Sequence, residues 1–191
     1  AVVHDARAHT PFELEVVDIT GNARLEAEYR TLLPVVEIDG VRFVNDSQGT
    51  QPDAVIAALR AFPAPVVLIA GGRDKGIDLS GLARVVGETA AAAVLIGESG
   101  PTLEGLFREA GLARTARAGT MDEAVAIADS LAHLALGDAP EGTVATVVMS
   151  PAAASFDMFE DYAARGRAFI ESVGRLAAAR AAGQSSDGRP A

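Results

Sequence analysis

Three short polar segments of the sequence combine residue types that could bind a small charged ligand. We call residues 45–50 the first loop, residues 71–76 the second loop and residues 150–157 the third loop. The first contains amide, carboxylate and hydroxyl groups, the second pairs two glycines with Lys75, and the third contains the hydroxyl of Ser155. Backbone N–H groups at glycines and a lysine cation suit an anion such as a carboxylate.

Each loop follows a run that reads as a strand, and helical patterns separate these runs. Asp39-Gly40 between alternating apolar residues predicts a β-hairpin over 35–44. Further strands are predicted at 66–70, 93–96, 115–118 and 144–149. Helices are predicted after Thr50 and over 79–90, 101–110, 120–137 and the segment that contains Phe159 to Val173. Thr50 is expected to cap the first of these helices, and Thr120 with Glu123 to form a capping box at the start of 120–137. This alternation predicts an α/β fold with a mostly parallel sheet flanked by helices. Polar loops at the carboxyl ends of such strands form ligand sites.

The residues alone leave other interpretations open for each loop. Lys75 is followed by Gly76 rather than Ser or Thr, so the second loop is not a P-loop, and a tight turn with a solvated lysine is favoured on spacing alone. The first loop could consist of capping groups and an Asx turn, or Asp46 could meet a ribose or a cation while Thr50 meets an anion. Tyr162 on the last helix could line a pocket or cover a helix flank, and the flank is favoured.

Composition excludes several classes of function. The net charge of −10 over 191 residues argues against nucleic-acid binding. The sequence contains no cysteine, which excludes disulfides, thiolate metal ligands and a cysteine nucleophile. No His, Asp and Glu cluster has metal-ligand spacing, and Ser155 has neither a G-x-S-x-G context nor a suitable histidine. No apolar run reaches the ~18 residues of a membrane span and no secretory signal is visible, so we expect a cytoplasmic protein without membrane contact.

Taken together, the three loops resemble the C-terminal domain of the Mur ligases, most closely that of the D-glutamate-adding members. That family has Asn-Asp-Ser-Lys-Ala-Thr, a Gly-Gly loop with a lysine, and Ser-Pro-Ala-x-Ala-Ser followed by a hydrophobic residue and Asp, in the same order as the three loops here. The resemblance covers residues 35–177 and implies a Rossmann-like domain. Residues 1–34 stay unassigned apart from a possible edge strand at 13–19, and 178–191 are expected to form a flexible tail.

The resemblance also implies ligands and residue roles. Lys75 and Thr50 would bind carboxylates of D-glutamate, Ser155 and the adjacent backbone at Phe156 would hold the same substrate, and Tyr162 takes the place of a family aromatic. Asp46, with Asn45 beside it and Gln48 in the same loop, would face the nucleotide. The second substrate would be UDP-N-acetylmuramoyl-L-alanine. ATP and Mg would be bound mainly by a central ATPase domain in cis or trans, which this sequence lacks, and no catalytic residue is assigned here.

Two departures from the family pattern bear on activity. Gln48 stands where the family has lysine, and Thr31 to Val35 replace a Leu-Pro-His-Arg stretch that should meet ATP. With no Walker sequence either, the chain alone is expected to be inactive in a ligase assay, and its start at Ala1 favours a piece of a longer protein. The alternative is a diverged, non-catalytic binding or interaction module. An independent nucleotide-binding α/β protein is disfavoured by the missing phosphate loop.

Overall fold

A six-stranded sheet with strand order β1-β2-β6-β3-β4-β5 forms the centre of the molecule. The structure is a computed structural model that describes residues 35–187. All neighbouring strands are parallel except β1 and β2. The prediction of a mostly parallel sheet is therefore confirmed. The strands are β1 (Val35–Ile38), β2 (Val41–Asn45), β3 (Val66–Gly71), β4 (Ala92–Ile96), β5 (Thr115–Ala118) and β6 (Ala145–Met149).

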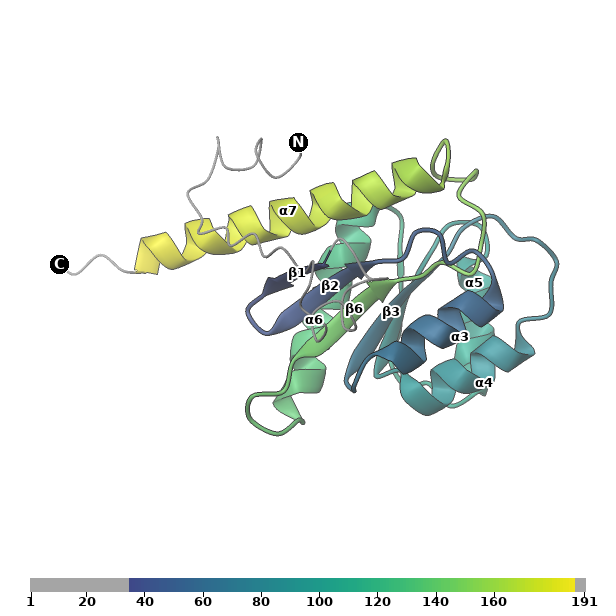
Figure 1. Ribbon diagram of the computed structural model, residues 1–191, viewed down its shortest axis with the longest axis horizontal. Coiled ribbons are helices and arrows are strands. Elements are labelled where there is room, and N and C mark those ends of the chain that lie inside the picture. The colour runs from purple at the N-terminus through teal and green to yellow at the C-terminus, as the bar shows by residue number, and fades with distance from the viewer. Residues whose placement is uncertain (1–34, 188–191) are drawn as a thin grey trace, which may run out of the picture.

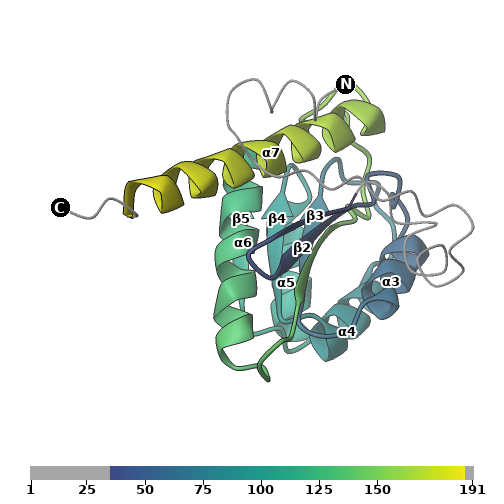
Figure 2. The same ribbon diagram turned by 60° about the vertical axis from the view of Figure 1, so that its left-hand side comes forward.

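Helices cover both faces of the sheet, so the molecule has three layers (Figures 1 and 2). One face packs against α3, α4 and α5, and the other packs against α6 and α7. The helices are α3 (Pro52–Ala61), α4 (Ser80–Thr89), α5 (Gly100–Glu109), α6 (Met121–Gly137) and α7 (Tyr162–Asp187). Helix α7 runs across its face and projects beyond the edge of the sheet (Figure 1).

Strand β3 is apolar at every position because helices cover it on both faces. Every residue of the strand is buried. Because successive side chains of a strand point to opposite faces, Val67 and Ile69 pack toward α6 and α7, whereas Leu68 and Ala70 pack toward the other helical layer. A central strand covered on both faces needs apolar residues at each position.

The β1–β2 hairpin follows from its turn residues. Asp39 and Gly40 have φ values of +48° and +77°, the left-handed conformation that a two-residue hairpin turn of type I′ requires. Strand β1 pairs with β2 in register from Val35 opposite Val44. Strand β2 then continues in parallel pairing with β6, which joins the hairpin to the main sheet.

The chain reverses direction in the sheet between β3 and β6. From β3 it proceeds outward through β4 to β5, and α6 then carries it back to β6 on the other side of β3. In open α/β sheets, ligands bind beyond the carboxyl ends of the strands at such a point. The second loop follows β3 and the third loop follows β6, so both lie at this position.

Some local expectations were wrong in detail. The N-cap residue of α3 is Gln51 rather than Thr50, and no side chain caps this helix. At α6, Thr120 does accept a hydrogen bond from the Glu123 N–H, but the Glu123 carboxylate accepts from the N–H of Gly119 instead of completing a capping box with Thr120. The strand suggested at 13–19 lies outside the described residues.

Helix α7 differs from its predicted extent at both ends. It begins at Tyr162, so Phe159 lies before the helix, and it continues to Asp187, well into the segment expected to be a tail. Alanine, the strongest helix former, is frequent after residue 176. The Arg180 guanidinium also ties this half of the helix to the hairpin and to α6, because it donates to Asp39 Oδ2 at 2.8 Å and to Asp129 Oδ2.

Candidate functional site

The third loop is the centre of the predicted site because it hydrogen bonds to the loops on either side. On the first-loop side, the Ala152 N–H donates to the Gly49 carbonyl at 2.9 Å. On the second-loop side, the Pro151 carbonyl accepts from the Gly71 N–H at 2.8 Å. Ala152 has a φ of +57°, an unusual conformation for a residue other than glycine and one often associated with functional sites. The structure therefore brings all three loops together.

The paired glycines of the second loop serve this close packing. A Cβ at Gly72 would lie 2.2 Å from the Ala154 carbonyl oxygen, and φ at Gly72 is +143°. The Gly72 N–H donates to Ser99 Oγ at 3.2 Å, and the Arg73 N–H donates to the Ala154 carbonyl at 2.9 Å. These N–H groups are thus engaged within the protein, although the sequence suggested that such N–H groups would approach a ligand.

Asp46 and Ser150 form a partly buried polar pair in the site. The Ser150 hydroxyl, which is fully buried, donates to Asp46 Oδ2 at 2.6 Å. Burial raises the pKa of the Asp46 carboxyl above its usual value, and hydrogen bonds from Ser150 and the Gly49 backbone offset part of that rise. The carboxylate is therefore held in one orientation at the carboxyl ends of β2 and β6.

Asn45 uses its side chain to fix the first loop against α7. Its Nδ2 donates to the Gly166 carbonyl at 3.1 Å, and its Oδ1 accepts from the Ser47 N–H at 3.1 Å, which forms an Asx turn. A Cβ at Gly166 would lie 2.7 Å from Ser47 Oγ, so the helix approaches the loop closely. Gln48, by contrast, is exposed.

Lys75 and Thr50 lie next to each other, as the predicted carboxylate site requires. Lys75 Nζ donates to the Thr50 carbonyl at 2.7 Å, and the lysine is exposed. No residue within 35–187 buries this cation, so its hydrogen bond to a neutral carbonyl can be exchanged for one to a carboxylate. A charged partner makes the shorter and stronger hydrogen bond.

Ser155, Phe156 and Tyr162 lie at different depths. Ser155 is 3% exposed, and its carbonyl accepts hydrogen bonds from Met158 N–H at 3.1 Å and Phe159 N–H at 2.8 Å. Phe156 is 67% exposed and Tyr162 is 52% exposed, so two aromatic rings stand in solvent next to the third loop and at the start of α7. Exposed aromatic side chains beside a polar loop suit contact with a ligand or with another domain.

Comparison with known proteins agrees with this arrangement of loops. Residues 32–150 match the family described as Mur ligase, glutamate ligase domain. The chain belongs to the Mur ligase family. The matched segment contains the first and second loops and ends at Ser150, the first residue of the third loop.

Several curated relatives of this Mur ligase domain are named UDP-N-acetylmuramoylalanine–D-glutamate ligase. The protein of that name from Desulfitobacterium hafniense (strain DCB-2) is 42% identical over 137 residues, 72% of this chain and 28% of its own length. Those from Symbiobacterium thermophilum and Nitrosospira multiformis are each 44% identical, over 75% and 79% of this chain. The chain spans about three-tenths of the length of these relatives.

The Mur ligase fold here contains a buried cation that sequence reasoning did not assign to the site. Arg165 on α7 is fully buried, and its guanidinium donates to the Ser47 carbonyl at 3.0 Å and to the Ala153 carbonyl at 3.1 Å. Burial lowers the pKa of Arg165 to about 10, and the charge of Asp157 opposes that fall. Arg165 thus links the first loop to the third.

Asp157 connects the third loop of this Mur ligase domain to a fourth segment. Its Oδ2 accepts from the Glu98 N–H at 2.8 Å, so the turn between β4 and α5 also belongs to the cluster. Beside this turn, a hollow of about 330 Å³ at the carboxyl ends of β4 and β5 is lined by Gly97, Arg117 and Gly119, among others. Periodicity does not identify Arg165, because a buried arginine violates the apolar pattern. Asp157 belongs to the third-loop motif, but the motif does not indicate its contact with Glu98.

Within residues 35–187, no group of His, Cys, Asp and Glu side chains is placed to hold a metal ion. In the same part of the chain, no helix has both the length and the apolar character needed to cross a membrane.

Proposed function

We propose that this chain is the D-glutamate-binding domain of an ATP-dependent amide ligase that adds D-glutamate to UDP-N-acetylmuramoyl-L-alanine. The observation that carries the proposal is the meeting of the exposed Lys75 ammonium with Thr50, beside the loop that contains Ser155. The printed name of the curated relatives supplies the substrate pair.

The chemistry of D-glutamate fits these groups. It has two carboxylates and one amine that must attack an activated carboxylate. Lys75 offers a cation to one carboxylate, and the backbone at Phe156 offers a hydrogen-bond donor to the other, with the buried Ser155 holding that turn in place. In the proposed reaction, ATP transfers its γ-phosphoryl group to the muramoyl-alanine carboxylate, the amine of D-glutamate displaces phosphate from the acyl-phosphate, and the nitrogen loses a proton. The domain contributes mainly by positioning the amine.

Asp46 of the first loop suits a hydroxyl-bearing part of a nucleotide, whereas Gln48 stands where a cation would face the phosphates. Asp46 presents a carboxylate, which accepts hydrogen bonds from hydroxyl groups, and Gln48 adds no positive charge. We therefore assign the ribose of ATP to Asp46, with Asn45 holding the loop in place. Phosphates and Mg would be bound by a central ATPase domain. The exposed rings of Phe156 and Tyr162 would contact the substrates as the domains close.

A non-catalytic binding module is the second candidate, and one observation favours it. Gln48 is neutral and exposed at a position that faces the proposed nucleotide, and the described first loop contains no lysine or arginine side chain. A protein that retained the sheet and the D-glutamate groups would still bind the amino acid without supporting phosphoryl transfer.

The test is a chimera in which residues 35–187 replace the matching region of the Desulfitobacterium hafniense relative. Lys75→Ala should raise the KM for D-glutamate about ten- to a hundredfold, because losing a charged hydrogen-bond partner costs roughly 1.5–3 kcal/mol. The KM for ATP should stay unchanged. Arg84→Ala is the matched control, because Arg84 is an exposed cation on α4 that pairs with Glu88.

Three outcomes would contradict this assignment. An unchanged KM for D-glutamate means that Lys75 is a solvated lysine on a glycine turn. Equal increases for both substrates indicate a general closure defect rather than a contact with D-glutamate. Amide formation by the purified 191-residue chain alone would show that no separate ATPase domain is needed, against the expectation from its missing Walker sequence.

A further inference from the structure

The contact between Ser150 and Asp46 is set by strand register. Strands β2 and β6 run parallel, and their last paired residues are Asn45 and Met149. Asp46 and Ser150 each come one residue later, so their side chains leave the ends of the two strands side by side. The hydroxyl of Ser150 can therefore reach Asp46 Oδ2 at 2.6 Å.

The backbone fixes both members of this pair. The Asp46 N–H donates to the Met149 carbonyl at 3.0 Å, and the Ser150 N–H donates to the Ile69 carbonyl at 3.1 Å. Ser150 is thus tied to β3 while Asp46 is tied to β6. A hydroxyl held in this way can fix the rotamer of the carboxylate that it contacts, since the donor itself does not move.

Gly49 provides the space for the pair. A Cβ at this position would lie 2.3 Å from Asp46 Oδ2 and 2.3 Å from Ser150 Oγ. Real Cβ atoms do not approach oxygens so closely, so any other residue at position 49 would displace one of them. The first loop is therefore folded around this hydrogen bond.

The presence of a carboxylate in this place is not explained by stability alone. Partial burial disfavours the charged form of Asp46, and a neutral side chain could close the same loop without this cost. An oriented carboxyl group with a raised pKa at the carboxyl ends of two strands is a candidate for ligand contact. The first loop thus retains the Asp46 carboxylate, which is costly to bury, and the buried Ser150 hydroxyl orients it.

We propose that Ser150 is a positioning residue for the nucleotide: its hydroxyl holds Asp46 Oδ2 so that the rest of the carboxylate meets a ribose hydroxyl of ATP. This inference rests on the proposed function, in which Asp46 contacts ATP. Ser150 itself does not touch the nucleotide, because it is fully buried. Its effect on nucleotide binding passes through Asp46 alone.

The first measurement uses the chain itself and no nucleotide. Carbon-13 NMR of the Asp46 carboxyl group should report a higher pKa in Ser150→Ala, since the lost hydrogen bond lowers the pKa in the parent chain. Ser99→Ala is the matched control, because Ser99 is a buried serine whose Oγ accepts from Gly72 N–H and does not contact Asp46. An unchanged pKa of Asp46 in Ser150→Ala overturns the inference, whatever the domain binds.

The second measurement uses the ligase chimera described above. Ser150→Ala should raise the KM for ATP about tenfold and leave the KM for D-glutamate unchanged. Asp46→Asn should also raise the KM for ATP. The double variant should match Asp46→Asn alone, because both changes act on one contact and their effects are not additive.

The outcomes separate the inference from the proposed function. If Asp46→Asn raises the KM for ATP and Ser150→Ala does not, the positioning role is wrong and the nucleotide contact stands. If Asp46→Asn leaves the KM for ATP unchanged, the nucleotide contact fails and the inference fails with it. Ser150→Cys keeps nearly the same volume but has a weak donor, so full activity in this variant would assign Ser150 to packing and overturn the inference.

Discussion

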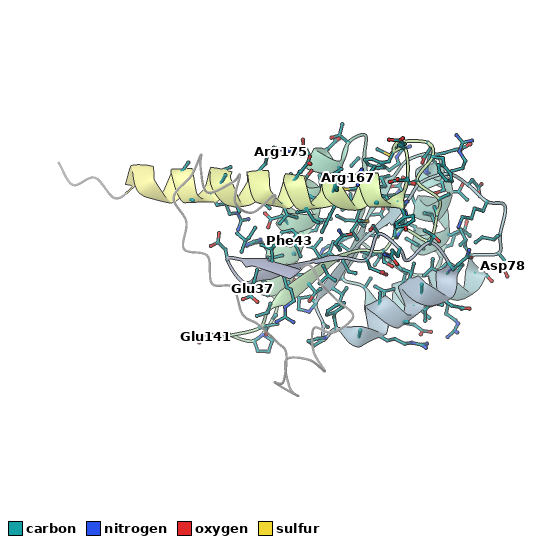
Figure 3. All side chains as sticks on the ribbon, turned by 45° about the horizontal axis from the view of Figure 1, so that its top comes forward. Glu37, Phe43, Asp78, Glu141, Arg167 and Arg175 are labelled. Carbon is teal, nitrogen blue, oxygen red and sulfur yellow. The ribbon has the colours of Figure 1, made fainter. Side chains whose placement is uncertain are left out.

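The first and second loops occupy equivalent places after two parallel strands, yet the protein holds them very differently. The first loop is fixed by side chains: Asn45 contacts α7, Asp46 contacts Ser150, and Arg165 donates to the Ser47 carbonyl. The second loop is fixed mainly through its backbone, because the N–H groups of Gly71, Gly72 and Arg73 donate to Pro151, Ser99 and Ala154. Its residues 73–76 are exposed, and so is the segment that follows, where Figure 3 shows Asp78 at the periphery of the molecule.

The difference matches what each loop must do in the proposed reaction. A half-buried carboxylate is held by protein groups rather than by mobile water, so it binds a ligand well only if the protein has already oriented it. A lysine carries its charge on a flexible four-carbon stem and can follow the ligand. Under the proposed function, the loop assigned to the nucleotide would be preorganised, whereas Lys75 in the loop assigned to D-glutamate would adjust to its ligand.

Removing Arg165 should cause the largest loss of stability, because this side chain holds the first loop against α7. Arg165→Met leaves the carbonyls of Ser47 and Ala153 without their buried donor and isolates the charge of Asp157, which should lower the free energy of unfolding by about 3 kcal/mol. Urea unfolding of the chain, followed by circular dichroism, measures this loss. Arg167→Met is the control, because Arg167 is exposed on the same helix (Figure 3). Equal losses in the two variants would mean that the first loop is not clamped by α7.

Much of the fold follows from the sequence because local rules and tertiary packing agree there. The Asp39-Gly40 turn, the apolar strand β3 and the helix stop at Gly137 lie where turn chemistry, burial and helix termination place them. The three loops could also be located, since each directly follows a strand. The predicted roles of Lys75 and Tyr162 remain predictions, and so do those of the other assigned site residues.

The supporting contacts could not be predicted, for physical reasons that differ from residue to residue. Arg165 is adjacent to Gly166 on the inner face of α7, and a fully buried arginine contradicts the hydrophobic pattern that identifies a core position. Ser150 donates to Asp46 only because β2 and β6 are neighbours, and strand order is not encoded in any local motif. The continuation of α7 to Asp187 depends on an anchor at Arg180 that involves three elements.

Adding one carbon atom at Gly49 should damage the first loop more than the same change in the second. In Gly49→Ala the new Cβ meets two oxygens, on Asp46 and Ser150, and we expect a loss of about 1–3 kcal/mol in the free energy of unfolding. In Gly76→Ala the space is open and only the φ of +62° is unfavourable, which costs about 1 kcal/mol. Gly105→Ala within α5 should be neutral or stabilising. A Gly49 variant as stable as the Gly105 variant would refute the crowding around Asp46.

A lysine at position 48 would give the first loop a mobile cation, as Lys75 does in the second loop, and should raise turnover. In the ligase chimera, Gln48→Lys should raise turnover several-fold, because a cation placed toward the phosphates stabilises charge that develops there. Gln48 is exposed, so the free energy of unfolding should change by less than about 0.5 kcal/mol. Gln48→Met removes the amide without adding charge and serves as the control. Equal turnover of the lysine variant and the parent chimera would show that position 48 does not face the phosphates.

The smallest effect concerns pH, and its sign distinguishes the enclosed Asp46 from an exposed carboxylate. The pKa of Asp46 is raised above 3.8, so the native state binds this proton more tightly than the unfolded chain does. The Asp46 carboxyl therefore stabilises the native state below pH 3.8, and this stabilisation is lost as the pH rises through the native pKa of Asp46.

The pH dependence of Asp122 has the opposite sign. Hydrogen bonds from Ser172 and Arg175 lower the pKa of Asp122, so its stabilisation of the native state is lost as the pH falls. Unfolding free energies of the parent, Asp46→Asn and Asp122→Asn between pH 3 and pH 6 should therefore diverge in opposite directions. If the stability of Asp46→Asn changes with pH as that of Asp122→Asn does, the Asp46 carboxylate is solvated. The first loop would then be as exposed to solvent as the second loop.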